Sequence, residues 1–589
     1  MAGIKCPPVG YIADKLPSQA TPPTDWHRQK ITPTTDDTMR RISTGLLRAT
    51  FAAFVLLLGA SALAQLPTTI AISNRTHEVD DLLQRGRQLE LERRWGDALT
   101  HYEEALRQYP GDAALQRRFD TARLHYDIQR RSVDRSYSET LTRLPLDRML
   151  DIYIQVLLKI ESHYVDSPNW KELVERGTNN LEIALSEPVF IQRYVPEANR
   201  PAARNLSSEL RSILSTRQIR TREEARQAVA VAASLAQKRI SVSPTVVALE
   251  YLCGATNSLD QYSAFLTPDQ LNEVYSQIEG NFVGLGIELK VQANALTIIR
   301  VITGSPAEQA GVHAGDRIIT VDGQTTSSMS TDQAANLLQG VEGSLAALTV
   351  LCIDGQERQM NIRRRRVDVP SVDQAGIIDR ENGIGYFKLT CFQKTTAHDL
   401  DAALWKLERE GMRSLIVDVR GNPGGLLVAA VEAVDRFVDH GVIVTTHGRS
   451  SQEDSSFSAH ADGTWQIPLV VIVDQDSASA AEIFAGAIHD LHRGTVVGVR
   501  TYGKGSVQGI FPLDGTSAGV RLTTAKFYSP SGHPYSLVGV EPDVVIQQVA
   551  RPIDGQPFST TGKDDAMLSA ALDVARGGGA QVLQARTPR

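Results

Sequence analysis

Two side chains of complementary chemistry follow apolar segments in the C-terminal half of this sequence. Ser479 comes shortly after the apolar run Leu469–Val473, and Lys504 lies between Gly503 and Gly505. A serine hydroxyl is a weak nucleophile that needs a base, and a lysine can act as that base when its amine is neutral. The pair therefore predicts a hydrolase in which Ser479 is the nucleophile and Lys504 is the general base.

The surroundings of Lys504 suit this role. Burial lowers the pKa of a lysine, and flanking glycines let the backbone pack closely around it. Gln508 is uncharged, so its amide can orient the amine by a hydrogen bond without stabilising the ammonium ion. His489 and His492 also follow Ser479, but we expect them at the surface or end of the helix that starts there, not in catalysis.

The transition state of acyl transfer needs hydrogen-bond donors for its oxyanion. If Ser479 opens a helix, the N–H of Ala480 points outward at the positive end of the helix dipole. Gly424 and Gly425 lie in a second strand-to-helix turn and can bring another backbone N–H to the same point. The two glycines also fit a turn that needs positive φ, and the two interpretations are compatible.

A nucleotide site is a competing interpretation of Lys504. Gly498 and Gly503 stand at the spacing of a phosphate-binding loop, which needs Ser or Thr after the lysine and a helix after the loop. Gly505 occupies the position of the Ser or Thr, and residues 507–513 are typical of a strand. We therefore predict that the protein binds no nucleotide.

The segments around these residues alternate between strand and helix. Several continuous apolar runs in residues 375–550 are typical of buried strands, and two of them lead directly into helices. The expected strands are at 384–389, 415–419, 469–473 and 495–499, and the expected helices at 426–438 and 480–491. This order predicts an α/β core with the candidate residues in its strand-to-helix turns.

A β-rich unit precedes the core, at residues 281–366. It opens with Gly284-Leu285-Gly286-Ile287 and contains the segment SPAEQAGVHAGDRIITVDG, and in this order of motifs it resembles a PDZ domain. In PDZ domains the opening loop presents N–H groups to a peptide carboxylate, and the peptide adds as a strand to the sheet edge. The resemblance implies that these four residues bind the C-terminus of a protein or peptide.

The chain before this unit is mostly helical, including residues 145–280. Residues 78–131 place small and aromatic residues as in one tetratricopeptide repeat, where small residues let two helices approach. They are Gly86, Trp95, Ala98, Tyr102, Ala105 and Pro110. Because one repeat cannot bury its own face, we expect residues 113–130 to add a capping helix. The unit is either an ordinary helical hairpin or a module for adaptor binding or self-association.

The N-terminal sequence predicts export. An arginine pair follows Met39, an apolar run covers residues 49–60, and a small-x-small cleavage motif ends at Ala64. We interpret residues 39–64 as a signal peptide and residues 1–38 as a wrongly assigned extension. If the segment stays uncleaved, it is instead a membrane anchor. In both cases we expect the rest of the chain in the periplasm or cell envelope.

The composition excludes several classes of protein. The chain has 589 residues, of which 42% are hydrophobic and 22% charged, so we expect several globular domains. Its net charge of −7 gives no reason to expect a nucleic acid as partner. The four cysteines form no C-x-x-C motif, so neither a zinc site nor a disulfide framework is indicated. We expect no metal and no cofactor.

Taken jointly, these motifs resemble the carboxy-terminal processing proteases, the S41 family of serine peptidases. The resemblance covers about residues 145–550. Its motifs are LDQYS at 259–263, DVRGNPGG at 418–425, SASAAE at 477–482, GKGSVQ at 503–508, SPSG at 529–532 and GVEPD at 539–543. Two features depart from the family pattern: Ala481 stands where many members have a serine, and the repeat-like unit is not a standard part.

The resemblance implies a fold and a set of roles. Ser479 is then the nucleophile, Lys504 the general base and Gln508 its orienting partner, in a ClpP/crotonase-like core at residues 367–550. A C-terminal tail at residues 551–589 follows. We predict an α/β and α+β multidomain protein, an exported serine endopeptidase that cleaves substrates near their C-termini after PDZ recognition. The alternative is a catalytically silent PDZ and tetratricopeptide scaffold for envelope proteins.

Overall fold

The chain forms two compact units, one spanning Asp14–Arg123 and the other Leu124–Arg589 together with Met1–Ala13. The computed structural model describes residues 10–12, 68–292, 295–327, 334, 337–451, 453–546 and 565–578. The predicted signal peptide lies outside these residues. Among the residues described, no helix is both long and apolar enough to cross a membrane.

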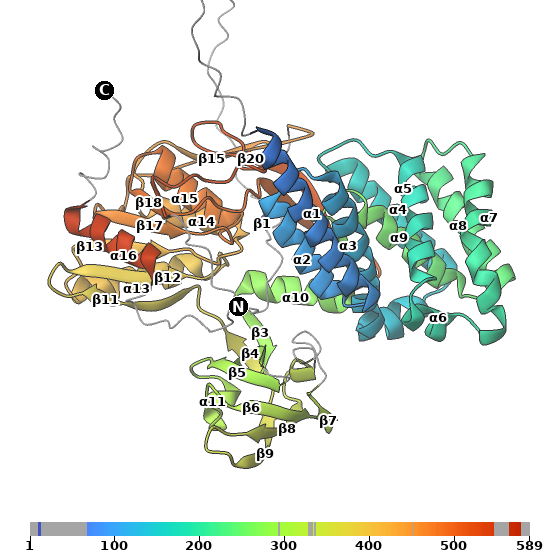
Figure 1. Ribbon diagram of the computed structural model, residues 1–589, viewed down its shortest axis with the longest axis horizontal. Coiled ribbons are helices and arrows are strands. Elements are labelled where there is room, and N and C mark those ends of the chain that lie inside the picture. Colours follow the sequence, from blue (N-terminus) through green and yellow to red (C-terminus); the bar gives the residue numbers. More distant parts are fainter. Residues whose placement is uncertain are drawn as a thin grey trace, which may run out of the picture. The chain divides into compact units, whose positions relative to one another are not determined.

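The smaller unit is helical, as the sequence predicted. It contains α1 (Thr68–Leu91), α2 (Trp95–Gln108) and the first part of α3 (Ala113–Val133) (Figure 1). A Cβ atom at Gly86 would lie 2.2 Å from the ring of Tyr102. Glycine at this position therefore lets α1 and α2 approach closely, which is the packing role that the repeat-like pattern assigns to it.

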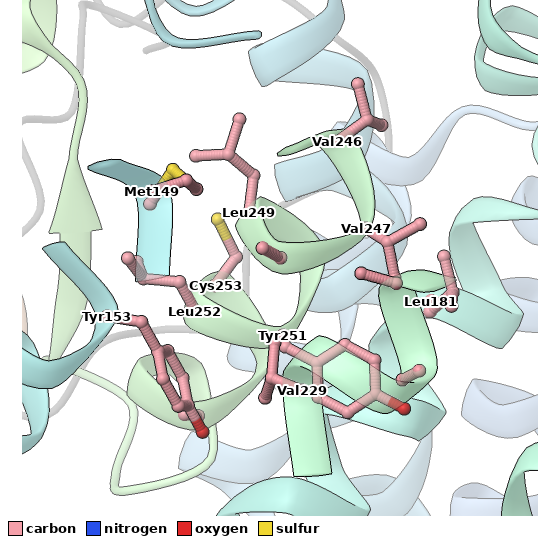
Figure 2. Packing of buried hydrophobic residues seen from close by; sticks show 14 of the residues in the cluster. Met149, Tyr153, Leu181, Val229, Val246, Val247, Leu249, Tyr251, Leu252 and Cys253 are labelled. Atoms are coloured by element: carbon pink, nitrogen blue, oxygen red, sulfur yellow. The ribbon is translucent and has the colours of Figure 1, made fainter. Parts of the chain in front are cut away.

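The larger unit begins with helices that surround α9 (Pro244–Asn257), in which every residue from Thr245 onward is buried. Side chains of α9 lie between Met149 and Tyr153 on one side and Leu181 on the other (Figure 2). The same hydrophobic core includes Val520 and Leu522 of the strand β20 (Gly519–Tyr528). The other helices here are α4 (Leu146–His163), α5 (Trp170–Ala184), α6 (Pro188–Tyr194), α7 (Arg200–Ser215), α8 (Arg222–Ile240) and α10 (Pro268–Glu279).

The PDZ-like unit contains a sheet of order β4-β5-β6-β8-β9, with β7 paired to β6 and β4 at one edge. Two further strands, β3 and β10, pair antiparallel and join the ends of the unit. The elements are β3 (Asn281–Gly284), β4 (Ile287–Gln292), β5 (Ala295–Val301), α11 (Pro306–Gln309), β6 (Arg317–Val321), β7 (Gln324–Thr325), β8 (Leu345–Leu351), β9 (Glu357–Arg363) and β10 (Arg365–Asp368).

A mostly parallel sheet carries the turns of the predicted site, in the order β11-β12-β13-β17-β18-β21. The strands β13 and β17 are buried along their whole length, which explains why their sequences are continuous apolar runs without alternation. The sequence predicted four of these strands to within one residue at each end. The strands are β11 (Val372–Asp379), β12 (Ile384–Leu389), β13 (Ser414–Asp418), β17 (Leu469–Val473), β18 (Thr495–Gly498) and β21 (Val544–Val545).

Helices cover both faces of this sheet. The helices α13 (Thr396–Arg409), α14 (Leu427–Asp435) and α15 (Ala480–Asp490) share one hydrophobic core with it. On the other face, α16 (Ala566–Asp573) packs against a separate apolar cluster that includes Tyr386. The sequence analysis treated residues 551–589 as a tail, whereas the structure places a core-covering helix within them.

A second sheet carries Gly425 and Gln508 of the predicted site, in the order β14-β1-β19-β20-β15-β16, with β2 paired to β20. Its strand β1 comes from the extreme N-terminus and runs parallel to both β14 and β19. The strands are β1 (Gly10–Ile12), β2 (Ala264–Leu266), β14 (Gly425–Leu426), β15 (Val442–Gly448), β16 (Ser455–Ser458), β19 (Ser506–Pro512) and β20 (Gly519–Tyr528).

Candidate active site

Ser479 lies in a strained turn between β17 and α15. Its φ is +56° and its ψ is −114°, a conformation that side-chain-bearing residues rarely adopt. Such strain persists only where the surrounding structure enforces it, and it is typical of nucleophile turns that lead from a strand into a helix. The side chain is only 1% exposed. The turn thus holds the hydroxyl at the start of α15, as the sequence predicted.

Lys504 lies in the loop between β18 and β19 and is 1% exposed. Burial, the largest cause, and the nearby Arg521 lower the pKa of Lys504 well below its usual value of 10.5. The carboxylates of Glu482 and Asp260 oppose this shift. The Nζ atom lies 4.6 Å from the centroid of the Tyr262 ring, whose face attracts a cation and therefore also opposes the shift. A neutral lysine, as a base requires, is therefore favoured here.

Glu482 joins the loops that carry Ser479 and Lys504. Its Oε2 accepts the backbone N–H of Ser479 at 2.8 Å and that of Lys504 at 2.8 Å. Its Oε1 accepts the N–H of Gly503 and the hydroxyl of Thr501, both at 2.6 Å. Because one carboxylate oxygen binds both N–H groups, the backbones of the nucleophile and of the base lie side by side. Burial raises the pKa of the Glu482 carboxyl to about 7.

The side chains of the predicted catalytic set are not all joined in this structure. The buried Ser479 Oγ makes no hydrogen bond within the described part of the chain. Gln508 is fully buried, and its Nε2 donates to the carbonyl and hydroxyl oxygens of Ser506 at 3.1 and 3.0 Å. Its Oε1, which would accept from the lysine amine, has no partner among these residues. The predicted orienting contact between Gln508 and Lys504 is thus not made.

The two glycines proposed for the oxyanion hole have different environments. The N–H of Gly424 donates to Asn422 Oδ1 at 2.8 Å, so it is already used. Gly424 also packs on the nucleophile turn, because a Cβ there would lie 2.8 Å from both the Ala478 carbonyl oxygen and the Ser479 Cβ. Its φ is +103°. Glycine at 424 therefore serves close approach, and Gly425 remains as the donor candidate of the pair.

Gly425 faces the slot that β1 occupies. The carbonyl of Gly424 and the N–H of Leu426 both bond to Phe392. Because backbone groups alternate along a strand, the N–H and carbonyl of Gly425 point to the opposite side, where Gly10 of β1 is its partner. Among the described residues, the N–H of Ala480, the other candidate donor, donates to no backbone group of the turn. Of the donors predicted from the sequence, Ala480 is therefore available, whereas Gly424 is used by Asn422 and Gly425 faces β1.

Two competing chemistries do not fit the observed positions. Gly505 is followed by the strand β19, not by the helix that a phosphate-binding loop needs. His489 lies at the far end of α15 from Ser479 and contacts Asp490, whose hydrogen bond is the main cause of a raised histidine pKa. A histidine base for Ser479 is therefore ruled out at this position.

The predicted peptide-binding loop, Gly284-Leu285-Gly286-Ile287, connects β3 to β4 at the edge of the PDZ-like sheet. The carbonyl of Leu285 accepts from Ala307, and that of Gly286 accepts from Ile302. Gly286 has a φ of +82°. The carbonyl groups of Leu285 and Gly286 thus hold the loop, and within the described part of the chain the N–H groups of these two residues make no backbone hydrogen bond.

Sequence reasoning gave no role to two residues that the structure brings to the site. Glu482 stands three residues after Ser479, the spacing of a helix capping box, and that signal could have drawn attention to it. Tyr262 belongs to a loop organised by Asp260, which accepts the N–H groups of Tyr262 and Ser263, both at 2.7 Å. No local pattern in the sequence places this tyrosine over Lys504.

The strained serine turn beside a buried lysine, in an α/β core, defines a serine hydrolase. A sequence model of "Peptidase family S41" matches residues 383–546, and one of the "PDZ domain" matches residues 297–351. The carboxy-terminal-processing protease of Bartonella bacilliformis is 36% identical over 300 residues, covering 50% of this chain and 68% of that protein. This chain therefore belongs to the carboxyl-terminal-processing proteases of family S41 and is a serine peptidase.

Other relatives extend the same likeness. The carboxyl-terminal-processing protease of Synechocystis sp. is 33% identical over 326 residues, or 54% of this chain and 75% of that protein. The chloroplastic carboxyl-terminal-processing peptidase 3 of Arabidopsis thaliana is 32% identical over 298 residues, or 48% of this chain and 57% of that protein.

Proposed function

We propose that this protein is an exported endopeptidase that processes other proteins at or near their C-termini with a Ser479–Lys504 dyad. Neutral Lys504 accepts the proton of Ser479 Oγ as this oxygen attacks a peptide carbonyl carbon. The N–H groups of Ala480 and Gly425 stabilise the oxyanion. Lys504, oriented by Gln508, then protonates the leaving amine, and water hydrolyses the acyl-enzyme.

One observation carries this proposal: Glu482 Oε2 holds the backbone N–H groups of Ser479 and Lys504 together, both at 2.8 Å. The two reactive side chains therefore start from neighbouring backbone positions. Assembly of the dyad then requires a rearrangement of side chains, while the loops stay in place. The unpartnered atoms Ser479 Oγ and Gln508 Oε1 are the groups that this rearrangement would satisfy.

The position of β1 supports a peptide as the substrate. This extended segment lies between β14 and β19, with Tyr11 paired to both Leu426 and Gln508. The slot beside Ser479 therefore accepts a peptide backbone as an added strand, a common mode of peptide recognition. A substrate bound in the same way would lie against Gly425.

The PDZ-like unit supports recognition of the substrate tail. In its loop the N–H groups of Leu285 and Gly286 are placed to bind a carboxylate, and the edge strand β4 follows directly. We infer that a substrate binds here through its free C-terminus and is cleaved at Ser479. The signal sequence at residues 39–64 would place this reaction in the periplasm or envelope, and the tetratricopeptide-like unit would bind an adaptor or a second copy.

The test compares wild-type protein with Ser479→Ala on one peptide, made with a free C-terminal carboxylate and as its C-terminal amide. We expect the wild type to cleave the free acid, to cleave the amide with a raised KM, and the variant to cleave neither. Equal cleavage by both proteins would refute the assignment of Ser479. If neither protein cleaves but both bind the free acid, the catalytically silent scaffold is the correct function.

A further inference from the structure

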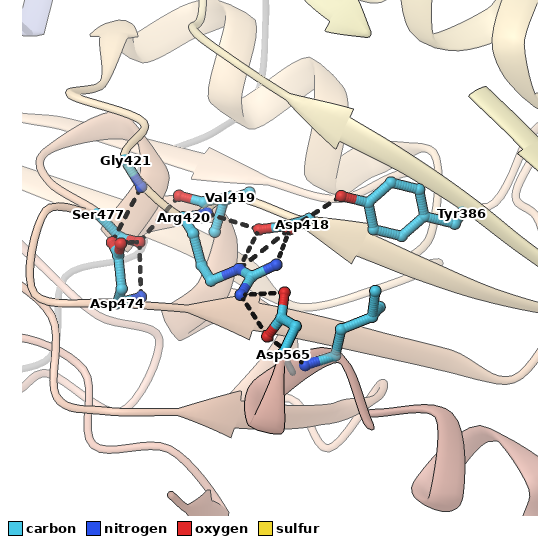
Figure 3. Close-up of polar contacts among 9 residues, drawn as sticks. Tyr386, Asp418, Val419, Arg420, Gly421, Asp474, Ser477 and Asp565 are labelled. Carbon is cyan, nitrogen blue, oxygen red and sulfur yellow. Dashed lines mark hydrogen bonds and ion pairs between the residues drawn. The ribbon is translucent and has the colours of Figure 1, made fainter. Parts of the chain in front are cut away.

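A polar cluster links the C-terminal helix to the turn after β13. The guanidinium of Arg420 donates from Nε and Nη2 to Asp418, at 2.6 to 3.0 Å, and from Nη1 to Asp565 at 2.9 Å (Figure 3). Asp565 is the N-cap of α16, because its Oδ1 also accepts the N–H of Leu568 at 3.0 Å. The Asp565 carboxylate thus caps the N-terminus of α16 and also binds Arg420, which belongs to another segment.

The same turn is connected to the nucleophile turn. The N–H of Gly421 donates to Asp474 Oδ1 at 2.9 Å, and the hydroxyl of Ser477 donates to the Val419 carbonyl at 2.8 Å (Figure 3). One step further, the N–H of Ala478 donates to the carbonyl of Asn422 at 3.0 Å. A displacement of residues 419–422 would therefore reach both Gly425 and Ser479, which flank the site.

Charge balance does not explain why Asp565 is there. Asp418 is 1% exposed, accepts a further hydrogen bond from Tyr386, and neutralises Arg420 by itself. A second carboxylate adds a negative charge to a largely buried cluster, which is not favourable in itself. What Asp565 supplies is a second direction of attachment, since it binds the nitrogen that Asp418 leaves free. The guanidinium is then fixed in its plane from two sides.

We propose that Asp565 is a positioning residue of the active site. Through Arg420 it fixes the turn that leads to Gly425, so the C-terminal helix sets the geometry of the oxyanion hole. This inference rests on the proposed peptidase function. It also implies that α16 acts on catalysis from the face of the sheet opposite to the helices α14 and α15.

The test uses Asp565→Ser, because serine caps a helix as well as aspartate does but is too short to reach Arg420. Loss of a whole oxyanion donor costs about 10²–10³ in kcat, and a displaced donor costs less, so we expect kcat to fall about tenfold. KM should change by less than kcat, because the predicted tail-binding loop of the PDZ-like unit, residues 284–287, is not altered. A peptide aldehyde inhibitor, whose adduct carries an oxyanion, should lose affinity by the same factor as kcat, and the product peptide should not.

Arg576→Ala is the matched control. Arg576 anchors the same C-terminal segment through an ion pair with Asp379 at 2.8 Å, but it does not contact the turn at Arg420. We expect this variant to retain wild-type kcat. The inference is overturned if Asp565→Ser keeps wild-type kcat, or if both variants lose activity equally, since the segment then contributes only stability. Failure of the wild type itself to cleave would refute the proposed function instead.

Discussion

Replacement of Glu482 by glutamine tests whether this residue holds the two catalytic loops together. The Glu482 carboxylate accepts from Ser479, Gly503, Lys504 and Thr501, so all four partners donate to it. Glutamine has one acceptor oxygen, and its NH₂ group would face two donors. Each hydrogen bond to a charged group contributes about 1.5–3 kcal/mol. Losing two of them predicts a destabilisation of about 3–6 kcal/mol.

The assay has two readouts: the free energy of unfolding from urea denaturation, and kcat on the tail-bearing peptide. We expect Glu482→Gln to lower both, because the NH₂ group pushes apart the backbones of Ser479 and Lys504. Glu432→Gln is the control, since Glu432 is an exposed glutamate of α14. A Glu482→Gln variant within about 1 kcal/mol of the wild type, with unchanged kcat, would show that the bridge does not hold the loops.

Three further predictions concern the base and the oxyanion hole. Because burial lowers the pKa of Lys504, kcat/KM should rise with pH to a plateau well below pH 10.5, and a midpoint near 10.5 would contradict a buried base. The unfolded chain binds this proton more readily, so Lys504→Met should be more stable than the wild type at neutral pH, and the difference should vanish above pH 10.5. Gly425→Ala should abolish activity, because its Cβ would lie 1.9 Å from the Phe392 carbonyl oxygen; activity near the wild-type level would contradict the need for close backbone approach at this position.

The central sheet could be predicted from the sequence because its strands are buried on both faces. The runs at 415–419 and 469–473 are continuously apolar, and each is followed by glycines or small residues that open a helix. Ser479 could be found because it stands between such a strand and the helix that follows, the position of a nucleophile turn. In these places the local pattern and the fold agree.

The features that could not be predicted from the sequence depend on contacts between distant segments. Nothing in residues 565–578 indicates that they cover a sheet face, because α16 is short and its partners lie far away in the chain. The state of Gln508 was not predictable either, since only packing decides whether its amide meets Lys504 or Ser506. The separate environments of Gly424 and Gly425 likewise follow from Asn422 and Phe392, which the sequence does not place.

A carboxylate near a lysine base normally stabilises the ammonium ion, which makes Glu482 an unexpected neighbour for Lys504. The structure resolves this conflict, because the Glu482 carboxylate accepts the backbone N–H of Lys504. The same carboxylate also accepts hydrogen bonds from Ser479, Gly503 and Thr501. These N–H and O–H dipoles stabilise the charged form of Glu482, although burial still raises its pKa to about 7. Burial then outweighs its attraction for the ammonium ion, and the pKa of Lys504 falls. Glu482 can thus align Lys504 with Ser479 without keeping the lysine amine protonated.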